Sequence, residues 1–120
     1  MRLGATIGLP EGKATRVAFG ETLVELGRED RDLVVADGDL NNSTRTDLFA
    51  KEFPDRFFNV GIAESDLVGI AAGMASAGKR AWLASFAAFV MCNAYDQLRM
   101  SVAFPCLDVK VVGKIGRAHV

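Results

Sequence analysis

Residues 57–77 read FFNVGIAESDLVGIAAGMASA, an aromatic start that leads into a long run of small and apolar residues. Residues 57–60 suit a short strand, and residues 63–77 have the length and composition of a helix. Glu64 puts a carboxylate at the start of this otherwise apolar helix. Because Gly69 and Gly73 are one turn apart, we expect the helix to be packed closely and covered on most sides.

Short apolar runs alternate with helical patterns on both sides of this stretch. The predicted helices are residues 14–28, 46–53, 63–77 and 86–102, and the predicted strands are residues 33–36, 57–60, 80–85 and 107–112. Strands that alternate with helices form parallel sheets with right-handed crossovers. The sequence therefore predicts an α/β fold, with a parallel sheet flanked by helices.

The composition limits the classes of partner and compartment. A chain of 120 residues with a formal charge of −1 predicts a single domain and gives no basic block for nucleic acid. The apolar runs are too short for a membrane span, and the first residues lack the features of a secretory signal, so we expect a cytoplasmic protein. Cys92 and Cys106 are far apart and predict two buried free thiols, with no metal-site spacing.

The C-terminal residues break the pattern of the rest of the chain. Residues 115–120, IGRAHV, match the translation of a common sequencing adapter, and the preceding adapter bases fit the codon of Lys114. We therefore divide the chain into a lead-in (1–13), a partial domain (14–113) and an adapter-derived segment (114–120). On this interpretation His119 has no chemical role, and the natural protein continues past Gly113.

Four features at predicted strand exits or helix starts could carry chemistry. They are Glu64, the Phe86 and Phe89 pair, the polar loop 37–44, and Arg16 in the first turn of a helix. Ligands bind at the carboxyl edge of open parallel sheets, which favours a functional interpretation. Taken singly, each feature also has a structural explanation: a helix dipole partner, core filling, a capped loop and a solvated surface side chain.

Taken in order, six segments resemble the pyrimidine-binding domain of the transketolase family. These segments are residues 14–16, 38–44, 53–57, 61–64, 86–89 and 95–100. The resemblance covers nearly all of residues 15–113. It implies the pyrimidine module of a thiamine-diphosphate-binding fold, incomplete at the C-terminus.

The resemblance also implies roles for individual residues around thiamine diphosphate. Glu64 is expected to contact N1′ of the aminopyrimidine ring, and Phe86 and Phe89 are expected to belong to the aromatic pocket around it. Asp39 is expected near the thiazolium side. A carboxyl that shares its proton with N1′ favours the imino form of the ring, which can remove the thiazolium C2 proton. An apolar pocket disfavours the charged carboxylate and so supports this role.

Arg16 and Ser43 are implied to hold the phosphate of a sugar substrate, through the planar fork of the arginine and the serine hydroxyl. The chain departs from the family pattern at Ser65-Asp66, which follow the glutamate, and at Cys92, where some members have a third aromatic residue. The substitution at Cys92 leaves substrate preference open.

The resemblance implies a two-carbon ketol transfer between sugar phosphates, carried out with a partner. A separate domain or N-terminal subunit would hold the diphosphate and a divalent metal such as Mg²⁺, in a homo- or hetero-oligomer. The position of Met1 just ahead of residues 14–16 favours a split gene over a fused one. Two alternatives stay open: another thiamine diphosphate enzyme, such as deoxyxylulose phosphate synthase or a 2-oxo acid dehydrogenase beta subunit, and a non-catalytic assembly module.

Overall fold

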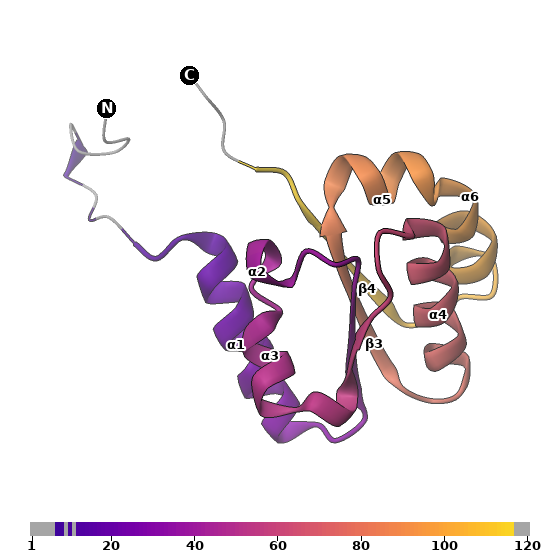
Figure 1. Ribbon diagram of the computed structural model, residues 1–120, viewed down its shortest axis with the longest axis horizontal. Coiled ribbons are helices and arrows are strands. Elements are labelled where there is room, and N and C mark those ends of the chain that lie inside the picture. The colour runs from indigo at the N-terminus through magenta and orange to yellow at the C-terminus, as the bar shows by residue number, and fades with distance from the viewer. Residues whose placement is uncertain (1–6, 9, 11, 117–120) are drawn as a thin grey trace.

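A computed structural model describes residues 7, 8, 10 and 12–116, which form a four-stranded parallel sheet with helices on both faces (Figure 1). The strands are β1 (Leu33–Asp37), β2 (Phe57–Asn59), β3 (Arg80–Phe86) and β4 (Val109–Lys114). Their order across the sheet is β2-β1-β3-β4, and every adjacent pair is parallel. The predicted α/β class and parallel sheet are confirmed.

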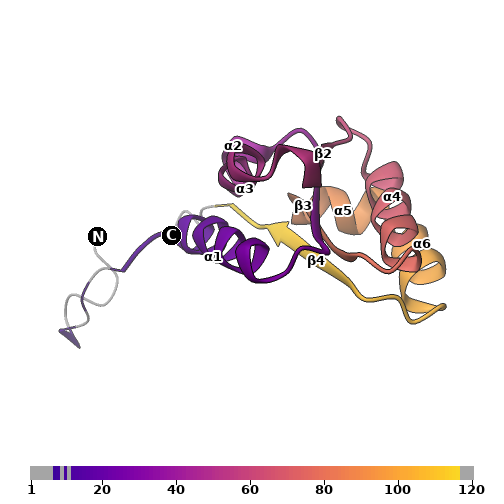
Figure 2. The same cartoon turned by 90° about the horizontal axis from the view of Figure 1, so that it is seen from below.

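The helices form two layers that are separated by the sheet (Figure 2). One layer contains α1 (Thr15–Glu29), α2 (Asn41–Thr44) and α3 (Asp47–Glu52), and a 3₁₀ turn, η2 (Pro54–Arg56), follows them. The other layer contains α4 (Glu64–Ser76), α5 (Ala87–Asn93), α6 (Tyr95–Gln97) and a π-helical turn, η3 (Leu98–Ala103). Among the described residues, no helix combines the length and the hydropathy that crossing a bilayer requires.

β1 is buried along its whole length because both faces of the sheet are covered there. Val34 and Ala36 belong to the core under α4, whereas Leu33 and Val35 belong to the core under α1 and α3. This burial on both faces explains why the strand is a continuous apolar run rather than an alternating one.

The single long helix predicted for residues 86–102 is wrong. The helix is interrupted at Ala94, whose φ of −127° and ψ of 18° lie outside the α-helical region. The hydroxyl of Ser65 donates to the carbonyl of Asn93 at 2.7 Å, which satisfies an acceptor at the end of α5. Because no proline or glycine marks the break, the sequence pattern runs through it without interruption.

The prediction that α4 is covered by other elements on most sides is also wrong. Its inner face is buried, but Ile70 is 41% exposed, and Gly69 and Gly73 face open space. Cys92 and Cys106 are both exposed, so the prediction of buried thiols fails as well. These side chains lie on the outer surfaces of helices and turns, which no described element covers.

β4 begins and ends two residues later than predicted. The turn before it contains Cys106 in a left-handed conformation, with a φ of 56°, and delays the start of the strand. The strand then continues through Lys114, which pairs in register with Phe86. His119 lies outside the described residues.

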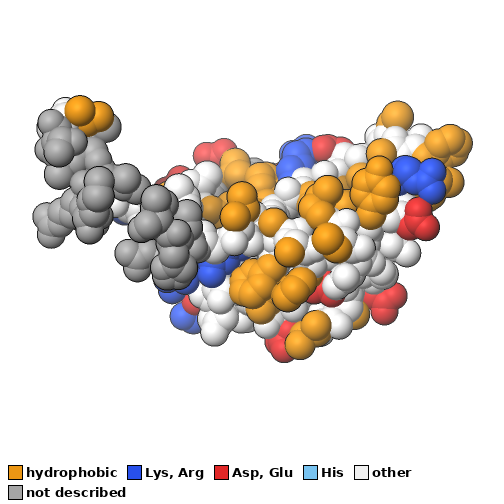
Figure 3. Space-filling model, turned by 90° about the horizontal axis from the view of Figure 1, so that it is seen from above, with side chains coloured by type: hydrophobic (Ala, Val, Ile, Leu, Met, Phe, Trp, Pro, Cys, Tyr) orange, Lys and Arg blue, Asp and Glu red, His pale blue; other side chains and the backbone are white. Residues whose placement is uncertain are grey.

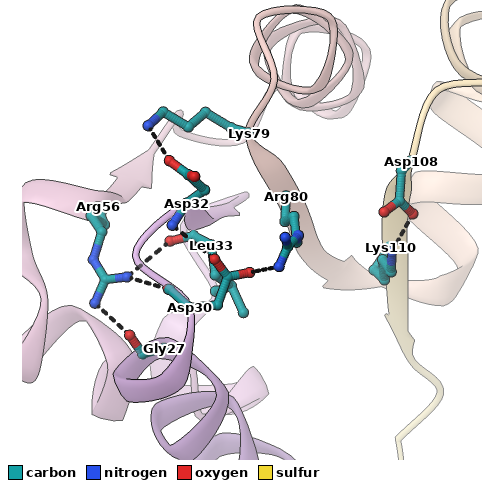
Figure 4. Close-up of polar contacts among 9 residues, drawn as sticks. All are labelled: Gly27, Asp30, Asp32, Leu33, Arg56, Lys79, Arg80, Asp108 and Lys110. Carbon is teal, nitrogen blue, oxygen red and sulfur yellow. Dashed lines mark hydrogen bonds and ion pairs between the residues drawn. The ribbon is translucent and has the colours of Figure 1, made fainter.

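Arg56 connects the end of α1 to the sheet (Figure 4). Its guanidinium donates to the carbonyls of Asp30 at 2.8 Å and of Gly27 at 2.9 Å, and lies 4.0 Å from the ring centroid of Phe53. Gly27 lies in the last turn of α1, where backbone carbonyls lack a partner further along the helix, so the arginine satisfies an acceptor there. At the same edge of the sheet, Asp30 pairs with Arg80 at 2.6 Å.

Asp37, the last residue of β1, is fully buried and organises the loop that follows. Its carboxylate accepts the Leu40 amide at 2.6 Å and the hydroxyls of Thr44 and Thr46 at 2.8 Å each. Burial raises the pKa of Asp37 above its ordinary value, although the three hydrogen bonds oppose this shift. One buried carboxyl therefore fixes the start of α2 and the entry to α3.

Replacing Arg56 is expected to destabilise the fold strongly. Arg56→Ala removes the two short hydrogen bonds to α1 and the contact with Phe53, so the free energy of unfolding should fall by about 2–3 kcal/mol. Urea denaturation followed by circular dichroism measures the change. Arg28→Ala is the control, because the Arg28–Glu52 pair is exposed and its loss should matter much less. Equal losses in the two variants would contradict the role given to Arg56.

Asp37→Asn should remove a loss of folding stability that the original chain undergoes as pH rises. The raised pKa means that the folded state favours the protonated carboxyl of Asp37. The resulting stabilisation of the fold is complete below the ordinary aspartate pKa of 3.8 and is lost as pH rises through the folded-state pKa. The variant cannot ionise, so its stability relative to the original chain should increase with pH over that window. Parallel urea titrations between about pH 3.5 and 7 test this. A constant difference, or one that decreases, would overturn it.

Candidate functional site at the carboxyl edge of the sheet

The chain changes direction across the sheet between β1 and β3. After β1 it goes outward to β2, and after β3 it goes outward to β4 on the other side. The connections that leave the carboxyl ends of β1 and β3 therefore diverge, and such a switch point is where open α/β sheets bind ligands. The candidate residues lie around this point.

Glu64 is the first residue of α4 and is only 5% exposed. The hydroxyl of Ser85, which is fully buried at the end of β3, donates to Glu64 Oε1 at 3.4 Å. Within residues 12–116, this is the one hydrogen bond made by the carboxyl. A surface carboxylate that only complements the helix dipole would be exposed, so this explanation does not fit Glu64.

Phe86 and Phe89 lie where β3 passes into α5, and their ring centroids are 5.7 Å apart at an angle of 40°. Phe86 is half-buried and Phe89 is 44% exposed. Neither ring belongs to the two buried cores, so core filling does not explain them. Ser85 connects the pair to Glu64, because it is bonded to Glu64 and precedes Phe86 in the chain.

A cavity of about 270 Å³ borders the two rings. Its other wall is formed by Lys114, Ile115 and Gly116, and the Lys114 ammonium lies 5.3 Å from the centroid of the Phe86 ring. These three residues belong to the segment that we interpret as adapter-derived.

Asp39 lies in the loop after β1, is exposed, and has a left-handed φ of 64°. Its Oδ1 accepts a hydrogen bond from Asn59 Nδ2 at 2.8 Å. Asn59 Oδ1 in turn accepts the Gly61 amide at 2.9 Å. The loops after β1 and β2 are thus joined at the same edge, by a residue that the sequence did not single out.

Arg16 and Ser43 lie on neighbouring elements near this edge. Arg16 is exposed in the first turn of α1 and forms no ion pair within the described ranges, and Ser43 is half-buried in α2. α1 and α2 approach closely because Gly20 has no side chain; a Cβ there would be 2.5 Å from the carbonyl oxygen of Arg45. α1, which carries Arg16, and α2, which carries Ser43, therefore lie side by side (Figure 1).

Hydrophobic side chains gather on the face that carries the strand ends (Figure 3). Exposed members at or near this edge are Ile62 (80%), Phe89 (44%) and Met91 (51%). Apolar side chains together with a few polar groups, such as the buried carboxyl at this edge, are typical of small-molecule sites.

Another cavity, of about 610 Å³, lies between α1 and α3. Four of its charged residues form pairs, Lys13 with Glu21 at 2.6 Å and Arg28 with Glu52 at 2.6 Å. No group of three or more metal-binding side chains occurs in the part of the chain that the structure describes. We therefore keep the edge that carries Glu64 as the candidate site.

The residues at the edge fit the pyrimidine end of thiamine diphosphate. The Glu64 carboxyl has one long hydrogen bond, so it keeps capacity for a ring nitrogen, and the two phenylalanines expose ring surface for stacking.

Comparisons with known proteins agree with this geometry. Residues 11–116 match the family model described as "Transketolase, pyrimidine binding domain". The chain is 50% identical over 100 residues to a putative transketolase C-terminal section from Methanocaldococcus jannaschii, covering 83% of this chain and 32% of that protein. It is 39% identical over 108 residues to a 1-deoxy-D-xylulose-5-phosphate synthase from Halothermothrix orenii, covering 84% and 17%.

A solved structure described as a split gene transketolase, inactive beta4 tetramer, superposes with a TM-score of 0.78 at 48% identity. The match covers 86% of this chain and 34% of that one, so the chain spans about a third of the split transketolase proteins that it matches. With the buried glutamate and the fold, these findings lead to one conclusion: the chain belongs to the transketolase family and corresponds to its pyrimidine-binding domain.

Proposed function

We propose that this chain supplies the pyrimidine-binding part of a split transketolase, in which Glu64 activates thiamine diphosphate for ketol transfer between sugar phosphates. The observation that carries the proposal is the burial of Glu64 at the switch point with one long hydrogen bond, from Ser85. When bound, thiamine diphosphate supplies a nucleophilic carbon for attack on the sugar carbonyl.

Glu64 would hold and release a proton at N1′, one of the two ring nitrogens of the aminopyrimidine. Its carboxyl is buried and accepts one long hydrogen bond, so it keeps a lone pair that could meet this nitrogen. The Ser85 hydroxyl can donate to a carboxylate and accept from a carboxylic acid, so it can pair with both states of Glu64. Phe86 and Phe89 would stack on the ring and exclude water from the shared proton.

Binding of the sugar phosphate is assigned to Arg16 and Ser43. The exposed guanidinium of Arg16 has no competing ion pair among the described residues, and Ser43 lies on the neighbouring helix. An arginine binds a phosphate through two parallel hydrogen bonds, and a serine hydroxyl can add a third. Asp39, exposed on the adjoining loop, is assigned to the thiazolium side of the cofactor.

The partner is a diphosphate-binding transketolase subunit, which would also supply the divalent metal. Two observations support a partner: the chain is similar to a transketolase C-terminal section and to a split gene transketolase, and the apolar side chains of Ile62, Phe89 and Met91 are exposed. Without that subunit, we expect the chain to be catalytically silent.

A second candidate function is that of a deoxyxylulose phosphate synthase, which the 39% identity to the Halothermothrix orenii protein favours. Both activities would use Glu64 in the same way, so the pyrimidine site does not separate them. Assays of the assembled complex with pyruvate as the donor, and with a ketose phosphate as the donor, distinguish the two.

Glu64→Gln tests the proposed role of the carboxyl. The amide is nearly isosteric but cannot exchange a proton with the ring nitrogen, so ketol transfer by the assembled complex should fall by about 10²-fold or more. A coupled assay of sugar phosphates gives the rate. Thermal unfolding of the free chain should change little.

Glu25→Gln is the matched control, because Glu25 is an exposed residue of α1. It should keep the activity of the original chain. Retention of ketol transfer in the Glu64→Gln complex, or absence of any activity in the complex with Glu64 intact, would refute the proposal.

A further inference from the structure

Two loops at the carboxyl edge are joined by a single side chain, that of Asn59. Its amide nitrogen donates to Asp39 Oδ1 at 2.8 Å, and its amide oxygen accepts the Gly61 backbone amide at 2.9 Å. One loop follows β1 and carries Asp39, and the other follows β2 and leads into α4. Asp39 is 20 residues from Asn59 in the chain, and Gly61 is two residues from it.

The loop after β1 has a backbone conformation that needs support, whereas the left-handed turn after β2 is made by a glycine. Asp39 has a φ of 64° and Gly61 a φ of 76°, and left-handed φ values are uncommon for residues other than glycine. The Gly61 carbonyl accepts the Ala63 amide at 2.9 Å, and Ala63 directly precedes Glu64. The hydrogen-bonded path from Asp39 through Asn59 therefore ends at the residue before the buried carboxyl.

We propose that Asn59 is a positioning residue that sets the loop bearing Asp39 and the turn preceding Glu64 relative to each other. The inference rests on the proposed function, because it assigns Asn59 to the placement of two residues that would act on opposite sides of the same cofactor. Asn59 itself acts through these neighbours and is not assigned a contact with the cofactor.

An amide is the side chain that suits this position. It offers a donor and an acceptor at fixed separation, so it can serve the Asp39 carboxylate and the Gly61 amide together. An aspartate would keep the acceptor for Gly61 but would place a second negative charge beside Asp39. An alanine would lose both bonds.

A double-mutant cycle with Asn59→Asp and Asp39→Asn tests the proposal. Asn59→Asp alone opposes two carboxylates, so we expect the ketol-transfer kcat of the assembled complex to fall by about 10- to 100-fold. Because Asp39 is assigned to the cofactor, Asp39→Asn should lower activity by itself, but it restores a donor that faces the new carboxylate of Asn59→Asp. Adding Asn59→Asp to Asp39→Asn should therefore change kcat by less than about 2-fold, an effect within ordinary additivity error.

A second readout uses the chain without cofactor or partner. Amide hydrogen exchange at Gly61 should become faster in Asn59→Ala, which loses the acceptor. In the double variant, exchange should stay close to that of the original chain. Glu25→Gln, an exchange between carboxylate and amide on the exposed surface of α1, is the control, and it should alter neither kcat nor exchange at Gly61.

The outcomes separate this inference from the proposed function. If the original complex transfers ketol units and Asn59→Asp lowers kcat equally with aspartate or asparagine at position 39, or not at all, the positioning role is refuted and the proposed function stands. If the original complex has no ketol-transfer activity, the proposed function fails, and this inference fails with it.

Discussion

The parallel pairing of β1 with β3 is the constraint on which the rest of the site depends. The register places Asp37 opposite Ala84, and the Gly38 amide continues the pairing with a hydrogen bond to the Ala84 carbonyl at 3.2 Å. Ser85 is therefore held beside Gly38, where a Cβ would lie 3.4 Å from the serine oxygen. Because the strand ends are aligned in this way, Ser85 faces the first turn of α4 and meets Glu64.

Two buried carboxyls at this edge have different surroundings and different roles. Asp37 accepts three short hydrogen bonds, which use its oxygens to fix the loop and the start of α2. Glu64 has a single long hydrogen bond and keeps capacity for a ligand. A saturated carboxyl stabilises structure, and an unsaturated one beside exposed aromatic rings is suited to chemistry. Asp37 and Glu64 are both buried, so their different proposed roles follow from the number of hydrogen-bond partners that each carboxyl has.

The sequence predicted the fold well where periodicity and strand exits were clear, as for β1 and α4. It missed the break at Ala94, since neither proline nor glycine marks it, and it misjudged Cys92 because exposure depends on which elements cover a helix. Composition and spacing alone left Glu64 ambiguous; its assignment came from the resemblance to the transketolase family. Asn59 was missed because its partner Asp39 is 20 residues away, a separation that no local pattern reports.

The central claim is that the Glu64 carboxyl meets the ring nitrogen of the pyrimidine. A crystal structure of the chain assembled with a diphosphate-binding subunit and thiamine diphosphate tests it most directly. The account predicts a Glu64 oxygen within hydrogen-bonding distance of N1′, about 2.6–3.2 Å, with Phe86 and Phe89 against the ring. A pyrimidine bound with N1′ facing solvent or another side chain, and Glu64 still paired only with Ser85, would contradict it.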